Sequence, residues 1–189
     1  MAKIRTFIAV EFSEELKKEI IQIQQRLKRD LRNLKWVPYS NFHLTLKFLG
    51  DVESKRIPEM AEGLALAIEG IKTFSVGFAG LGGFPEILKP RVIWLGVDRG
   101  KKELIQLQEA VEKELTFQGF APEKKPYSPH LTLARSRRDT NLRVVGELLS
   151  QIKVQPTRTD LIQSIRIMKS DLRPQGPIYT CLKEIPLLG

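Results

Sequence analysis

The sequence predicts an α+β fold in which mainly antiparallel sheets carry helices on their outer faces. One observation is the order of the elements, because strand-like and helix-like segments follow one another without a long linker. The other is a repeat: His-Leu-Thr-Leu occurs at His43 and again at His130, 87 residues apart (130 − 43). Each copy lies in a short strand that follows a turn-forming segment. We therefore expect two related halves that face each other.

The first half is expected to contain three strands and two helices. β-branched and aromatic residues over 4–11 predict a strand. Ser13 is placed to cap the following helix, whose leucines and isoleucines over 16–31 recur every three or four residues and form one apolar stripe. The other elements of this half are expected at 34–37 and 42–49, which are strands, and at 54–69, which is a helix ending at Gly70.

The second half is expected to begin with a strand over 73–78 and then a loop. Gly80, Gly82, Gly83 and Pro85 indicate a turn-rich connection, because their spacing matches neither the Walker pattern nor the dinucleotide fingerprint. The later elements are expected to be strands at 91–97, 130–134, 164–170 and 178–184, and helices at 102–118 and 141–152. Trp36 and Trp94 lie in apolar, strand-like settings and are expected in the core.

Length and composition predict one domain over residues 1–189, made of two small lobes that share a core. No run reaches the length of a transmembrane helix, and residues 1–5 lead into a strand instead of a signal peptide. The lone Cys181 cannot form an internal disulfide. We therefore expect a cytoplasmic protein with no membrane partner. The sequence does not determine the oligomeric state, and a monomer is our expectation.

The charge balance favours an anionic partner. Lys and Arg total 31 against 22 Asp and Glu, which gives a net charge of +9. General solubility is the alternative explanation of such a surplus. One Cys and two His leave little material for a structural zinc site, and two His without a nearby Asp, Glu or Cys make a poor ligand set, so we expect no metal.

The repeated tetrapeptide carries a set of groups suited to phosphate ester chemistry. Side chains alternate across a strand, so His43 and Thr45 share one face, and His130 and Thr132 share one face. One imidazole can accept a proton from an attacking hydroxyl while the other donates a proton to the leaving oxygen. The two hydroxyls can donate hydrogen bonds to phosphate oxygens. A structural, hydrogen-bonded role is the alternative for each histidine taken alone.

Basic residues accompany both copies. Alternation places Lys47 on the face of the first histidine, as a candidate substrate-binding residue. Arg135 is a second candidate, although strict alternation would turn it toward the leucine side. Further positive charge near the second copy comes from Lys124, Lys125, Arg137 and Arg138. This charge suits a polyanionic substrate.

At these residues the chain resembles the two-histidine (2H) phosphoesterases, and most closely the bacterial and archaeal RNA 2′,3′-cyclic phosphodiesterases, also called 2′-5′ RNA ligases. Their signature is a pair of His-x-Thr-x motifs, matched here by 43–46 and 130–133. Further similar segments are 5–10, 36–38, 43–50, 81–85, 91–97 and 129–135, which spread over most of the chain.

The resemblance implies a bilobal fold with pseudo-two-fold related halves around a central cleft that holds both histidines. It implies hydrolysis of an RNA 2′,3′-cyclic phosphate end, such as a tRNA-derived end, to a 2′-phosphomonoester. His43 would donate a proton to the departing 3′ oxygen and His130 would accept one from water. Thr45 and Thr132 would hold the phosphate, and no metal or nucleotide cofactor would take part. If a 5′-hydroxyl end replaced water, the same site would join strands through a 2′-5′ bond.

Two other functions remain open from the sequence. The chain could be a non-catalytic RNA-binding module that uses its basic face, although such a module has no need of paired imidazoles. It could also be a phosphodiesterase for small cyclic nucleotides or for 2′-5′ oligoadenylates.

Overall fold

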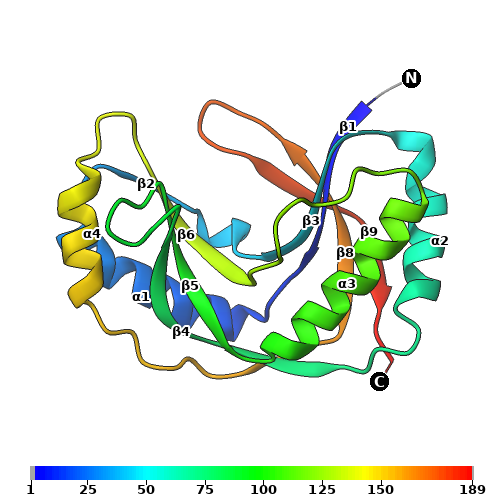
Figure 1. Ribbon diagram of the computed structural model, residues 1–189, viewed down its shortest axis with the longest axis horizontal. Coiled ribbons are helices and arrows are strands. Elements are labelled where there is room, and N and C mark those ends of the chain that lie inside the picture. Colours follow the sequence, from blue (N-terminus) through cyan, green and yellow to red (C-terminus); the bar gives the residue numbers. More distant parts are fainter. Residues whose placement is uncertain (1–2, 189) are drawn as a thin grey trace.

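A computed structural model describes residues 3–188 and shows two antiparallel sheets, each in its own lobe (Figure 1). The four-stranded sheet has the order β3 (Leu44–Glu53), β1 (Lys3–Val10), β8 (Ser164–Asp171) and β9 (Ile178–Pro186). The five-stranded sheet has the order β2 (Leu34–Trp36), β6 (His130–Ser136), β5 (Val92–Arg99), β4 (Phe74–Phe84) and β7 (Asp160–Ile162).

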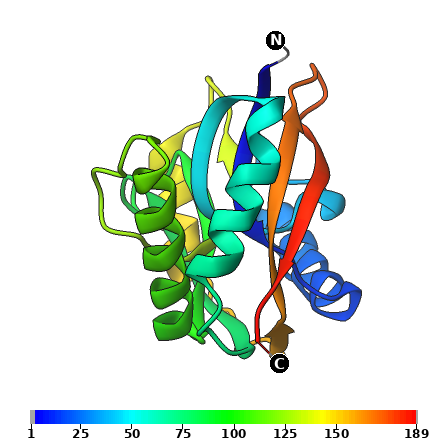
Figure 2. The ribbon, with the colours of Figure 1, turned by 90° about the vertical axis from the view of Figure 1, so that its right-hand side faces the viewer.

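Two helices accompany each sheet. The five-stranded sheet carries α1 (Glu14–Asp30) and α4 (Leu142–Gln151), and the four-stranded sheet carries α2 (Ile57–Ala67) and α3 (Lys101–Phe117). Figure 2 shows α2 and α3 on the side of their lobe that faces away from the other lobe. The predicted α+β class, with antiparallel sheets and outer helices, is therefore confirmed. Short 3₁₀ turns precede β3 (Tyr39–Asn41) and α2 (Ser54–Arg56).

The two lobes are interleaved along the chain. Helix α1 follows a strand of the four-stranded sheet but packs on the other lobe, where the Gln24 amide donates to the carbonyls of Val37 and Leu133 at 2.9 and 3.0 Å. Helix α3 follows a strand of the five-stranded sheet but packs against β3. Both helices are 17 residues long. Their starts at residues 14 and 101 have the same offset of 87 (101 − 14) as the tetrapeptides. The internal repeat therefore extends well beyond the two histidines.

Local signals explain where helix α1 begins and ends. The Ser13 side chain accepts a hydrogen bond from the Leu16 amide at 3.3 Å, as predicted for the cap. Glu14 and Glu15 occupy the first turn, while Lys28 and Arg29 occupy the last, which complements the helix dipole.

The glycine-rich segment after residue 78 is a strand and not the expected loop. Strand β4 continues to Phe84, and Gly80 sits at a bulge with φ of +70°. At Gly82 a Cβ atom would lie 2.1 Å from the Trp94 ring, so the missing side chain makes room for that ring. The glycines led to the prediction of a loop because glycine is common in turns, but in a strand it also allows close packing of a neighbouring side chain. Strand β7 was also not anticipated.

One hydrophobic core links the two sheets. Ile8 and Ile167 of the four-stranded sheet belong to the same buried cluster as Ile93 and Leu131 of the five-stranded sheet.

No helix within residues 3–188 has both the length and the apolar character needed to cross a bilayer.

Candidate active site

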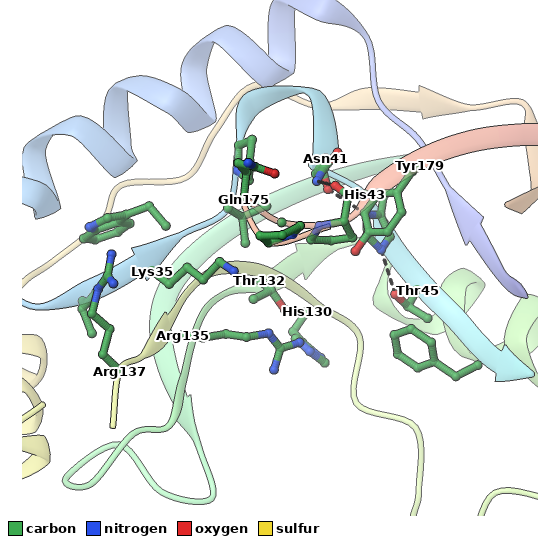
Figure 3. Close-up of a pocket in the computed structure, with 18 residues that line it drawn as sticks. Lys35, Asn41, His43, Thr45, His130, Thr132, Arg135, Arg137, Gln175 and Tyr179 are labelled. Carbon is green, nitrogen blue, oxygen red and sulfur yellow. Dashed lines mark hydrogen bonds between the residues drawn. The ribbon is translucent and has the colours of Figure 1, made fainter. Parts of the chain in front are cut away.

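The two tetrapeptides meet at one cavity, which we call the catalytic cavity (Figure 3). It has a volume of about 580 Å³ and is lined by His43 and Thr45 of the first copy and His130 and Thr132 of the second. The histidine-bearing segments belong to different sheets, so both lobes contribute to one site. The remaining lining residues are Leu34, Lys35, Trp36, Val37, Pro38, Asn41, Phe48, Arg135, Arg137, Pro174, Gln175, Gly176, Pro177 and Tyr179.

Each imidazole is oriented by a carbonyl two residues before it. Nδ1 of His43 lies 2.7 Å from the Asn41 carbonyl oxygen, and Nδ1 of His130 lies 2.7 Å from the Ser128 carbonyl oxygen. A carbonyl can only accept, so each Nδ1 carries the hydrogen and Nε2 of the neutral ring has none. The Thr45 hydroxyl, 3.0 Å from Nε2 of His43, donates to that bare nitrogen. In both rings Nε2 is therefore the atom available for proton transfer.

Aromatic rings pack around the two histidines and leave each of them only partly exposed. The ring centroid of His43 lies 5.0 Å from Phe7 and 5.1 Å from Tyr179. The ring centroid of His130 lies 4.9 Å from Phe84 and 5.9 Å from Trp94. This packing fixes the ring planes and lowers the local dielectric around both imidazoles.

Burial disfavours the charged form of both rings. Desolvation lowers the pKa of His43 to about 4, and the nearby His130 contributes to that decrease. Desolvation also lowers the pKa of His130, with a further contribution from the Arg135 guanidinium. Hydrogen bonds to the carbonyls of Asn41 and Ser128 oppose these shifts. Both imidazoles are therefore neutral near pH 7 when no anion is bound.

A bulge in each histidine strand resets the alternation of side chains. Leu46 has no partner between the paired residues Thr45 and Lys47, and Leu133 has none between Thr132 and Ala134. After the bulge, successive side chains exchange faces relative to a regular strand.

The bulge in β6 brings Arg135 to the catalytic cavity. Strict alternation would have turned this side chain toward the leucines, but Arg135 is exposed and lines the cavity near His130 (Figure 3). In the first copy the corresponding position, 87 residues earlier, is Phe48, which is 60% exposed and also lines the cavity. The two copies thus present different side chains, one cationic and one aromatic, at equivalent places.

The bulge in β3 has the opposite consequence for Lys47, which was predicted to share the face of His43 but does not. Lys47 is buried, and its ammonium donates to both carboxylate oxygens of Glu112 at 2.8 Å and to the Ala121 carbonyl at 2.9 Å. The side chain therefore anchors β3 to helix α3, and its charge is neutralised there. Alternation failed because the bulge at Leu46 lies between Lys47 and the histidine.

The cavity also gathers residues that the sequence did not indicate. Tyr179 comes from β9, and only the long-range pairing of the four-stranded sheet brings it beside His43. Trp36 was expected in the core, but it is half-buried and lines the cavity, with the Lys28 ammonium 5.6 Å from its ring centroid. Lys35 and Arg137 add positive charge to the wall. The sequence did hold one signal for this wall, which is that Lys35 stands directly before Trp36 in a short predicted strand.

Comparison with known proteins identifies the family. The family described as "LigT like Phosphoesterase" matches the chain twice, over residues 10–94 and 95–179. The chain belongs to the LigT-like phosphoesterases. Each match covers one tetrapeptide, in agreement with the repeat seen in the structure.

Residues 3–188 contain no group of three or more His, Cys, Asp and Glu side chains arranged to hold a metal ion.

Two relatives match this chain over most of their length and of its own. The RNA 2′,3′-cyclic phosphodiesterase of Thermotoga maritima is 36% identical over 186 residues, which is 98% of this chain and 97% of the relative. The protein of the same name from Aeropyrum pernix is 40% identical over 152 residues, which is 80% of this chain and 85% of the relative. The similarity therefore extends through both lobes of the LigT-like fold.

Solved structures share that fold. TT0787 of Thermus thermophilus superposes with a TM-score of 0.80 at 26% identity, covering 98% of this chain and 99% of the other. Escherichia coli LigT complexed with 3′-AMP superposes with a TM-score of 0.76 at 23% identity, covering 98% and 99%.

Proposed function

We propose that this LigT-like phosphoesterase hydrolyses a 2′,3′-cyclic phosphate at the end of an RNA to a 2′-phosphomonoester. The observation that carries the proposal is the pair of imidazoles that line one cavity and carry their hydrogen on Nδ1, which leaves Nε2 of each ring without one. Its relatives from Thermotoga maritima and Methanothermobacter thermautotrophicus, 36% and 33% identical over 98% of this chain, are named RNA 2′,3′-cyclic phosphodiesterase. An acid and a base on opposite sides of one phosphorus are what in-line opening of the ring requires.

In this mechanism, His130 takes a proton from water through its bare Nε2, and the resulting hydroxide attacks phosphorus. His43 gives a proton to the departing 3′ oxygen, which leaves the phosphate on the 2′ oxygen. His43 must first be protonated, and the bound phosphate anion favours this because an opposite charge raises the pKa of an imidazole. The Thr45 hydroxyl, which donates to Nε2 of neutral His43, is then released to donate to the phosphate.

The phosphate is held in our proposal by hydroxyl and guanidinium donors. Thr45 and Thr132 stand two residues after the histidines at the cavity wall and donate to non-bridging oxygens, where charge accumulates in the transition state. The Arg135 guanidinium adds a charge-assisted donor beside His130. No metal or other cofactor enters these steps.

The partner in this proposal is an RNA strand, with tRNA-derived ends among the candidates. Lys35, Arg135 and Arg137 line the cavity, so phosphates upstream of the cyclic end meet positive charge. Both tetrapeptides of the catalytic cavity belong to the same polypeptide, and we propose that the enzyme acts as a monomer.

The test is hydrolysis of an oligoribonucleotide that ends in a 2′,3′-cyclic phosphate, with EDTA present throughout. A 2′-phosphate product supports the proposal, and a 3′-phosphate product reverses the assigned leaving oxygen. The variants His43→Ala and His130→Ala should each lose roughly 10²–10⁴-fold in rate. Retention of most activity by both variants would rule out the mechanism.

Measurements of RNA binding and of substrate preference distinguish the proposed enzyme from the two alternative functions. A non-catalytic RNA-binding module would bind RNA with steep salt dependence, keep that binding in both histidine variants, and release no product. A preference for mononucleotide cyclic phosphates or 2′-5′ oligoadenylates over RNA ends would show that the substrate is smaller than we propose.

A further inference from the structure

The segment that leads into His130 has no regular secondary structure. Residues 118–129 connect α3 to β6, and the side chains of residues 121–126 are exposed. Within residues 3–188 the His130 ring forms one hydrogen bond, to the Ser128 carbonyl, whereas the His43 ring forms two. The orientation of the proposed base therefore depends on how firmly this segment is held.

The start of the segment is held against the four-stranded lobe. Lys47 of β3 donates to the Ala121 carbonyl at 2.9 Å. Glu112 of α3, whose carboxylate pairs with Lys47, accepts from the Glu123 amide at 2.8 Å. These contacts fix residues 121–123 and end well before Ser128. The carbonyl that orients His130 thus needs an anchor closer to it.

Tyr127 is placed to supply that anchor. Its hydroxyl donates to the backbone carbonyl of Thr45 at 2.9 Å. Strand β3 lies at the edge of its sheet, so one side of its backbone can accept from a side chain. Burial raises the pKa of the Tyr127 hydroxyl, so this group keeps its proton and remains a donor. The bond joins the two histidine-bearing segments, because Thr45 belongs to the first tetrapeptide and Tyr127 directly precedes Ser128.

The two halves hold their orienting carbonyls by different means. In the first half the side-chain amide of Asn41 donates to the Pro177 carbonyl at 2.8 Å, so the orienting residue is itself tethered. The equivalent residue of the second half is Ser128, which is exposed. The neighbouring Tyr127 therefore provides for the second half what the Asn41 side chain provides for the first.

We propose that Tyr127 is a positioning residue for the reaction, whose hydroxyl holds the Ser128 carbonyl, and through it the His130 ring, in place relative to the first tetrapeptide. This inference rests on the proposed function, in which His130 is the base. Without the bond to Thr45, the segment can shift and Nδ1 of His130 loses its fixed acceptor. The hydrogen can then move to Nε2, the atom that must be bare to accept a proton. A misplacement of about 1 Å can also cost roughly 10²-fold in rate.

The experiment uses Tyr127→Phe, which removes the hydroxyl and keeps the ring. The substrate is an oligoribonucleotide that ends in a 2′,3′-cyclic phosphate. We expect kcat to fall roughly tenfold or more while KM changes less than about twofold, because the groups proposed to hold the phosphate remain. Thr157→Val is the matched control, since it removes another hydroxyl, which accepts from the Phe78 amide at 3.0 Å and lies outside the catalytic cavity. This control should lower the urea midpoint of unfolding and leave kcat unchanged.

The ¹⁵N chemical shifts of the imidazoles give a second readout, which loss of stability alone would not change. Near pH 7 both rings of the wild-type protein should carry their hydrogen on Nδ1. In Tyr127→Phe we expect His130 to show a mixture of the two neutral tautomers, while His43 keeps the wild-type form.

Three outcomes would overturn the inference. These are an unchanged kcat in Tyr127→Phe, an equal fall of kcat in Thr157→Val, and a His130 tautomer that is the same in Tyr127→Phe as in the wild type. Failure of the wild-type protein to hydrolyse the cyclic end would instead overturn the proposed function. The imidazole shifts would still decide whether Tyr127 fixes the His130 ring.

Discussion

At the scale of single residues, the two halves orient their histidines alike but surround them differently. Asn41 and Ser128, which are 87 positions apart (128 − 41), both accept from an imidazole Nδ1. The side chains at the cavity are not equivalent, because Arg135 stands where the first half has Phe48. A guanidinium near His130 disfavours its protonated form, which suits a base. The neighbours of the two histidines therefore differ, although burial lowers the pKa of both rings.

The first prediction concerns the protonation of the two rings. In the empty protein, burial should hold the pKa of His43 near 4 and the pKa of His130 below its usual 6.5. Inorganic phosphate should raise both values, because an anion favours the charged imidazole. Ring proton chemical shifts followed by NMR against pH would measure this, with His43→Gln and His130→Gln to assign the signals. A pKa of 6.5 or above for either ring in the empty protein would contradict the prediction.

The second prediction tests Arg135 as a phosphate-binding residue. Arg135→Ala should raise the KM for a cyclic-phosphate substrate or lower kcat/KM by roughly tenfold or more, since a hydrogen bond to a charged group is worth about 1.5–3 kcal/mol. Arg138→Ala removes an exposed arginine three positions along and should leave steady-state kinetics near wild type. If the two variants changed kcat/KM by the same factor, Arg135 would act only by adding to the positive charge of the protein surface and not by contacting the phosphate.

At the scale of the strands, the sequence predicted the placement of the histidines but not that of the basic residues after them. Alternation correctly put the leucines of each tetrapeptide in the core and the His-Thr pair on the other face. Alternation failed beyond the tetrapeptides, because the bulges at Leu46 and Leu133 depend on pairing with β1 and β5. Tyr179 was equally beyond reach, since its position depends on the pairing of strands near opposite ends of the chain. Local pattern cannot report either kind of long-range contact.

The third prediction concerns the glycines of β4. Gly82→Ala would place a Cβ atom 2.1 Å from the Trp94 ring, which must then move. Overpacking of this kind costs about 1–3 kcal/mol in stability. Because Trp94 packs against His130, kcat should fall as well. Urea unfolding and steady-state kinetics would measure both effects. Gly70→Ala is the matched control, since a Cβ there meets nothing within 4 Å.

A result in which Gly82→Ala lowers stability while kcat stays unchanged would separate Trp94 from the positioning of His130. The ring would then serve packing alone.

At the scale of the whole molecule, the two lobes are interleaved along the chain. The four-stranded sheet takes strands from both ends of the chain, and α1 and α3 each cover the sheet of the other half. Neither lobe is a continuous segment, and the hydrophobic core runs through both. Such an arrangement favours loss of both sheets together, because neither can keep its covering helix when the other unfolds.

The fourth prediction is therefore a single unfolding transition. Trp36 and Trp94 both lie in strands of the five-stranded sheet, so their fluorescence reports on that lobe. Amide exchange of residues in β1 and β8 reports on the other lobe. The free energy of unfolding from fluorescence in urea should equal the free energy of opening from exchange at the most protected amides of these strands. Clearly different values would show that each lobe folds by itself, and the cavity between them would then depend on docking of two separate units.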